Sequence, residues 1–82
     1  MIDLSQLKKN DVIVTSFGEV AKVNGSCERR DNIYIIYLDK AIRLTKSSTV
    51  VDIVCNKDGT SVCDPRVQPM RIVKIIKGDS NG

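Results

Sequence analysis

The chain has 82 residues, of which 41% are hydrophobic and 28% are charged, with 13 Lys and Arg against 10 Asp and Glu. This length holds one hydrophobic core, and the composition excludes a disordered or collagen-like chain. The absence of His removes the commonest general base and metal ligand. A nucleophile paired with His is therefore excluded within this chain, and we expect a protein that is not an enzyme.

The cysteines and the apolar runs limit the cofactors and the compartment. Cys27, Cys55 and Cys63 are odd in number and lack the spacing of a zinc site, so we predict no metal and no cofactor. The sequence opens without a secretory signal. Its longest apolar run, residues 33–38, is far shorter than the about 20 residues of a membrane-spanning helix. We expect a soluble, cytoplasmic protein with no membrane partner.

The N-terminal segment predicts a single helical turn within residues 3–9. Asp3 is placed to cap this turn, and Leu4 and Leu7 fall on one side of it. A turn this short is not stable alone, so we expect it to pack on the rest of the chain.

From Asp11 onward the pattern changes to β-strands. Runs of β-branched or alternating residues predict strands at 12–15, 19–23, 33–38, 50–55, 60–63 and 70–76. Residues 41–45 are ambiguous between a short strand and one turn of helix. Gly18 is expected to take a positive φ in the first turn. The last run alternates poorly, which predicts a bulge or a central position in a sheet.

The clearest local signal is Asp58-Gly59 between two strand-like runs. Asp-Gly suits a two-residue type I′ turn, in which both residues need a positive φ. In that register Cys55 pairs with Val62, which separates apolar from polar side chains. Cys55 and Cys63 then point to opposite faces and should not form a disulfide, and Cys55 is expected in the core.

So many short strands predict an all-β fold, a small barrel or sandwich. The segment 7–14, Leu-Lys-Lys-Asn-Asp-Val-Ile-Val, resembles the L-x-x-G-D-x-V opening of Src-homology-3-like (SH3-like) barrels, including KOW and Tudor modules. Segments 17–23 and 33–39 are similar to their second and third strands, and 65–67 to their 3₁₀ turn. The resemblance implies a five- to six-stranded SH3-like barrel. Asn10 stands where the family has Gly, and Asn also tolerates left-handed conformations.

We expect this barrel to be a single domain of residues 1–77, followed by a flexible polar tail of residues 78–82. The polar composition of the tail, which ends in Ser-Asn-Gly, offers nothing for a core to bury.

The strand at 33–38 is apolar on both faces, because alternate side chains point opposite ways. We predict that one set fills the interior: Ile33, Ile35 and Tyr37. The other set then faces outward: Tyr34, Ile36 and Leu38. Two alternatives stay open for the outward set. Leu4 and Leu7 cover it, or it forms a contact patch for a partner or for a second copy of the chain.

Basic side chains supply another candidate site. Four of them are candidates for a phosphate-binding patch: Arg29, Arg30, Arg71 and Lys74. The alternative is an ordinary solvated surface, since aspartates are interspersed among the basic residues. With three aromatic residues and no Trp, a platform that stacks single-stranded bases is disfavoured.

We therefore expect a small binding module without enzymatic activity. The leading hypothesis is a protein-binding adaptor or inhibitor that uses an apolar strand face and a loop rim: Tyr34, Ile36, Leu38, Arg29 and Arg30. In size the chain resembles the accessory proteins that bacteriophages and mobile elements encode to bind host complexes. The alternative is a barrel of the KOW/Tudor type that binds nucleic acid or nucleoprotein. A homodimer through residues 33–38 is a further alternative.

Overall fold

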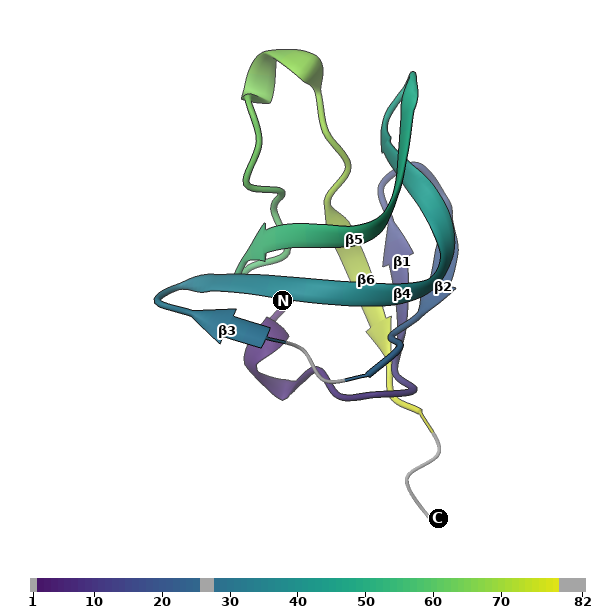
Figure 1. Ribbon diagram of the computed structural model, residues 1–82, viewed down its shortest axis with the longest axis vertical. Helices are drawn as coiled ribbons and strands as arrows, with labels where there is room; N and C mark the ends of the chain where they lie inside the picture. Colours follow the sequence, from purple (N-terminus) through teal and green to yellow (C-terminus); the bar gives the residue numbers. More distant parts are fainter. Residues whose placement is uncertain (1, 26–27, 79–82) are drawn as a thin grey trace.

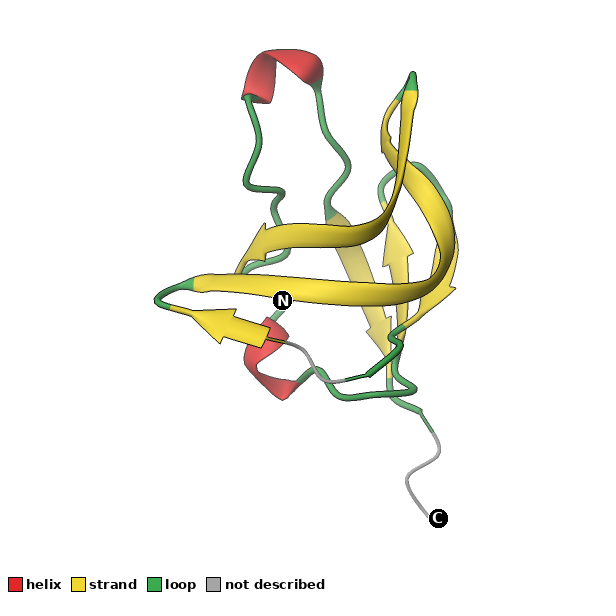
Figure 2. Ribbon diagram, viewed as in Figure 1, coloured by secondary structure: helices red, strands yellow, loops and turns green. Residues whose placement is uncertain are grey.

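The structure is a computed structural model that describes residues 2–25 and 28–78. Within them the chain forms six β-strands and two single 3₁₀ turns, η1 (Leu4–Gln6) and η2 (Pro65–Val67) (Figure 2). The all-β prediction and the N-terminal helical turn are confirmed. Asp3 caps η1 as expected, since its side chain accepts a hydrogen bond of 3.0 Å from Ser5 N. In the described part of the chain, no helix is long and apolar enough to cross a membrane.

The first sheet has the order β2-β1-β6, with all neighbours antiparallel. Its strands are β1 (Val12–Thr15), β2 (Val20–Lys22) and β6 (Ile72–Ile76). Gly18 has a φ of 80° in the turn between β1 and β2, as predicted. The register between β1 and β6 shifts between Val14 and Thr15. This shift confirms the predicted bulge in the last strand.

The second sheet has the order β3-β4-β5, also antiparallel. Its strands are β3 (Glu28–Arg30), β4 (Ile33–Thr45) and β5 (Ser48–Asn56). The ambiguous segment 41–45 is the second half of β4. A shift of register between Tyr37 and Ile42 bends this long strand, and Leu38 forms an isolated bridge to Val23, just after β2.

The two sheets form two layers, and β4 and β5 run across β1 and β6 (Figure 1). Isolated bridges connect the layers at Val23–Leu38 and Thr60–Arg71. The strands do not close into a barrel, so the five- to six-stranded SH3-like barrel that the resemblance implies is not supported. The strand expected at 60–63 is reduced to single bridges, because the chain leaves the sheet there for the loop that carries η2. Pro65 opens η2 and has no N–H to donate to a ladder.

One hydrophobic core lies between the inner faces of the sheets. It contains the following buried side chains: Leu4, Leu7, Ile13, Ala21, Val23, Tyr34, Ile36, Leu38, Ile42, Ile53, Cys55, Met70 and Ile72. Leu4 and Leu7 confirm that the N-terminal turn packs on the rest of the chain. Cys55 is buried as predicted, Cys63 is exposed, and Cys27 lies outside the described residues.

The inward and outward sets of β4 are the reverse of the prediction. Tyr34, Ile36 and Leu38 are only 3%, 0% and 5% exposed. Tyr37 is 38% exposed, and the other two residues of its set are half-buried: Ile33 and Ile35. The even-numbered set packs in the core together with Leu4 and Leu7. Six consecutive apolar residues carry no alternation that distinguishes the two faces, so the sequence did not reveal which set faces inward.

The turn after β5 has three residues rather than two, so the predicted register is wrong by one position. Asn56 N donates to Thr60 O at 2.8 Å, and Val62 N donates to Val54 O at 2.9 Å. Gly59 alone takes the positive φ, at 91°, while the Asp58 side chain accepts a hydrogen bond of 3.1 Å from Thr60 N. The Asp58 side chain thus supports a turn in which only the Gly needs a left-handed conformation.

A buried carboxylate ties the two ends of the chain together. Asp11 is 3% exposed and accepts hydrogen bonds from Lys8 N at 2.9 Å, Lys77 Nζ at 2.7 Å and Gly78 N at 2.8 Å. Asn10 beside it has a φ of 76°, the conformation that the sequence permits there. Gly78, assigned to the tail by the sequence, is therefore fixed to the domain, and residues 79–82 lie outside the described residues.

We predict that Asp11→Asn lowers the free energy of unfolding by about 2 kcal/mol at neutral pH, because the amide offers one acceptor oxygen to three donors. Burial raises the pKa of Asp11, but the hydrogen bonds from Lys77, Gly78 and Lys8 outweigh it, and the net pKa is lowered. Wild-type stability should thus fall as the pH drops below about 3.9. The variant should lose less stability in that range. Urea unfolding across pH measures these free energies. If Asp64→Asn, at an exposed carboxylate, lowered the free energy of unfolding at neutral pH as much as Asp11→Asn, the special role of Asp11 would be contradicted.

Two of the glycines with a positive φ, Gly18 and Gly59, offer a matched pair of substitutions. A Cβ at Gly18 meets nothing within 4 Å, whereas at Gly59 it lies 2.9 Å from the Ile72 carbonyl oxygen and 2.9 Å from Ile2 Cγ2. We expect Gly18→Ala to cost about 1 kcal/mol, for the conformation alone. Gly59→Ala should cost about 1–3 kcal/mol more, because the backbone cannot yield. Thermal unfolding measures both, and equal shifts would contradict the close approach of Gly59 to the Ile72 backbone.

Candidate protein-binding face

The outward side of β3, β4 and β5 carries a contiguous apolar surface. We call this surface the β4 face and define it by five side chains: Ile33, Ile35, Tyr37, Val54 and Val62. Ile35 pairs with Val54 across β4 and β5, and Val62 follows on the next segment through its hydrogen bond to Val54. Val54 is 38% exposed and Val62 is 44% exposed. An exposed apolar cluster of this kind is typical of a surface that contacts another molecule.

Tyr37 is the largest side chain of the β4 face, and it is held in place. Its hydroxyl donates a hydrogen bond of 2.7 Å to Glu28 Oε2 on the neighbouring strand. This hydrogen bond, together with desolvation and the negative charges of Glu28 and Asp52, raises the pKa of Tyr37. The phenol therefore stays protonated at neutral pH and keeps the hydrogen that it donates to Glu28.

Polar side chains border the β4 face on two sides. The register places Glu28 opposite Ile35 and Arg30 opposite Ile33 on β3. On β5 it places Asp52 opposite Tyr37. An apolar centre with a charged rim of both signs is the usual anatomy of a protein–protein interface.

The predicted partner-binding residues are divided between core and surface. Tyr34, Ile36 and Leu38 are buried together with the leucines of the N-terminal segment, so the contact patch predicted on them is wrong. Of the two alternatives given for these side chains, cover by Leu4 and Leu7 is the one that the structure shows. Arg29 and Arg30 are exposed, as a rim requires. The exposed apolar side chains of β4 lie on the opposite side of the strand from the predicted patch.

The four basic residues of the alternative hypothesis do not gather on one face. Arg29 and Arg30 are adjacent on β3, so their side chains point to opposite sides. The Arg29 guanidinium lies 5.8 Å from the centroid of the buried Tyr34 ring, a cation–π contact that covers the core. Arg71 and Lys74 belong to the other sheet, at the start of β6 and within it.

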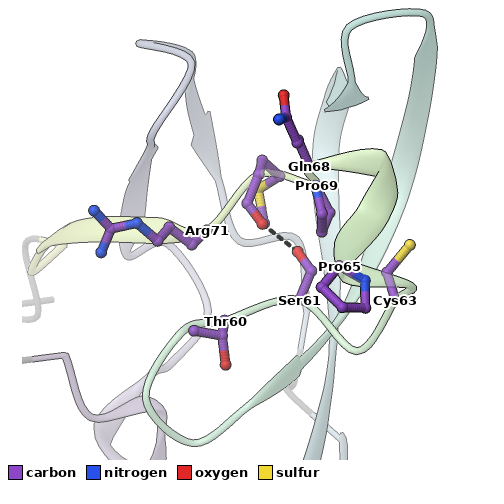
Figure 3. Close-up of a pocket in the computed structure, with 8 residues that line it drawn as sticks. Thr60, Ser61, Cys63, Pro65, Gln68, Pro69 and Arg71 are labelled. Carbon is purple, nitrogen blue, oxygen red and sulfur yellow. Dashed lines mark hydrogen bonds between the residues drawn. The ribbon is translucent and has the colours of Figure 1, made fainter.

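A shallow hollow of about 290 Å³ lies inside the loop that carries η2. It is lined by Thr60, Ser61, Cys63, Pro65, Gln68, Pro69, Met70 and Arg71. Ser61 Oγ donates to the Met70 carbonyl, and the Arg71 side chain points away from Cys63 (Figure 3). The polar groups of the hollow thus close the loop rather than converge on a ligand. Across the described residues, no three His, Cys, Asp or Glu side chains cluster as metal ligands.

Comparison with known proteins adds no family to this description. No family model matches the chain, and neither a curated protein nor a solved structure matches it.

Proposed function

We propose that this protein is a non-enzymatic protein-binding module that docks a partner protein on the β4 face. The observation that carries the proposal is the contiguous apolar surface of Ile33, Ile35, Tyr37, Val54 and Val62 around a pre-oriented tyrosine. An adaptor or inhibitor acts by such binding alone, and the rigid sheet beneath the surface suits recognition. The small size of the chain agrees with an accessory protein that binds a larger complex.

Physical chemistry explains why this surface suits a protein partner. Tyrosine is enriched at interfaces because its ring buries a large area while its hydroxyl keeps a polar partner. Here the hydrogen bond to Glu28 already restricts the Tyr37 side chain, so less conformational entropy is lost on binding. Ile35 and Val54 are β-branched and stiff, which adds to the same preorganisation.

Nucleic-acid binding is the competing function, and the placement of the basic residues does not favour it. Phosphate binding draws its affinity from several cations that face one backbone together. The cation–π contact of Arg29 and the separation of Arg71 from β3 work against such a group. The basic residues therefore support a nucleic-acid ligand less than the β4 face supports a protein partner.

Val54→Lys tests the proposed function in a capture experiment from a lysate of the source organism, with nuclease and at high salt. Val67 on η2 supplies the matched control, since it is 48% exposed and Val67→Lys makes the same change of charge away from the β4 face. We expect wild type and Val67→Lys to retain the same defined protein. Val54→Lys should retain at least about tenfold less, because a lysine at the centre of the interface must be desolvated.

Nucleic-acid binding predicts a different result in the same capture experiment. Retained material that is mostly nucleic acid, lost at high salt and on Arg29→Glu with Arg30→Glu, would contradict the protein-binding proposal. Circular dichroism and thermal unfolding of each variant separate loss of binding from loss of folding. A protein retained equally by Val54→Lys would exclude the β4 face as its docking site.

A further inference from the structure

A second exposed surface lies on the other layer of the molecule, on the outward side of β2, β1 and β6. We call it the β1 face, and its paired positions are Val12, Val14, Val20, Lys22, Lys74 and Ile76. Val20 and Ile76 are each 45% exposed, and Val12 and Val14 are half-buried between them. Inner faces of the two sheets share the core, so the β1 face and the β4 face point away from each other (Figure 1).

The charges of the β1 face have one sign only. Lys22 and Lys74 are exposed, and none of the six positions holds a carboxylate. Ion pairs among the described residues engage other cations, in the pairs Arg43–Glu19, Arg66–Asp64 and Lys77–Asp11. At the sheet edge, the Asp39 side chain accepts a hydrogen bond of 3.1 Å from the backbone N of Lys22. The two ammonium groups therefore lack an ionic partner within the described residues.

The register fixes the spacing of these two lysines. Lys22 pairs with Val12 on β1, and Lys74 pairs with Val14 on the same strand. They stand on the two outer strands, two residues apart along the central one. Standard strand spacing and rise then put their Cα atoms about 12 Å apart, with Val12 and Val14 between them. An occupant of this surface needs apolar groups flanked by two anions at about that separation.

We propose that the β1 face docks an acidic amphipathic α-helix of a partner protein. A helix laid on a sheet is a stable way to cover an apolar sheet face. Carboxylates at positions i and i+7 of a helix lie on one side, about 10 Å apart. The long, flexible lysine side chains can adjust from their Cα separation of about 12 Å to this spacing. Apolar side chains at i+3 and i+4 then fall over Val12 and Val14. This surface is separate from the β4 face, so one protein could join two partners.

The test titrates the isotope-labelled protein with a synthetic helical peptide and follows amide resonances by NMR. The peptide has about 15 residues, the length at which an isolated helix forms in water, with Glu at i and i+7 and Leu at i+3 and i+4. A second peptide carries Lys in place of both Glu residues. We expect the Glu peptide to shift the resonances of β1, β2 and β6, and the Lys peptide to bind at least about tenfold more weakly.

Charge reversal on the protein completes the test. Lys22→Glu with Lys74→Glu should weaken binding of the Glu peptide about tenfold or more, whereas Lys46→Glu with Lys57→Glu, two exposed lysines off this face, should leave it unchanged. The proposal is overturned if the Glu peptide shifts no resonance of the β1 face or if both peptides bind equally. It is also overturned if anionic vesicles or a single-stranded oligonucleotide shift these resonances more strongly. None of these results depends on the β4 face.

Discussion

The alternation of side chains along β4 is the constraint on which the rest of this structure depends. The strand spans Ile33–Thr45 and contributes Tyr34, Ile36, Leu38 and Ile42 to the single core. It pairs with β3 and β5 and bridges to the end of β2, so it connects the two layers. A shift by one residue would exchange every inward and outward side chain of the strand. The same alternation that builds the core thus creates the β4 face.

The core is closed at its ends by polar contacts rather than by continuous strand pairing. Asp11 gathers donors from both ends of the chain, and Glu19 accepts a hydrogen bond from Arg43 N, which joins the first turn to the far half of β4. Buried carboxylates are tolerated only when such partners outweigh the loss of hydration. The outer faces of both sheets keep exposed apolar side chains, and these two surfaces are the β4 face and the β1 face.

Much of this fold could be predicted from the sequence, and the errors have identifiable causes. Period-two runs located the main strands, and the poor alternation of the last run located its bulge. The orientation of β4 was predicted wrongly because six consecutive apolar residues carry no alternation that distinguishes the two faces of the strand. The turn at Asp58-Gly59 was predicted, but its length was wrong by one residue, because Asp closes a turn with its side chain as readily as with a positive φ. For the same reason, the β4 face lies on the side of the strand opposite to the predicted contact patch.

The orientation of β4 determines both the core and the β4 face, and the two tyrosines of the strand report it directly. Hydroxyl-radical footprinting, read by mass spectrometry at single residues, compares the solvent access of two chemically identical side chains on one strand. We expect Tyr37, 38% exposed, to be oxidised much faster than Tyr34, 3% exposed, in the folded protein. In denaturant the two rates should become similar. Faster oxidation of Tyr34 in the folded protein would invert the strand and remove the β4 face as described.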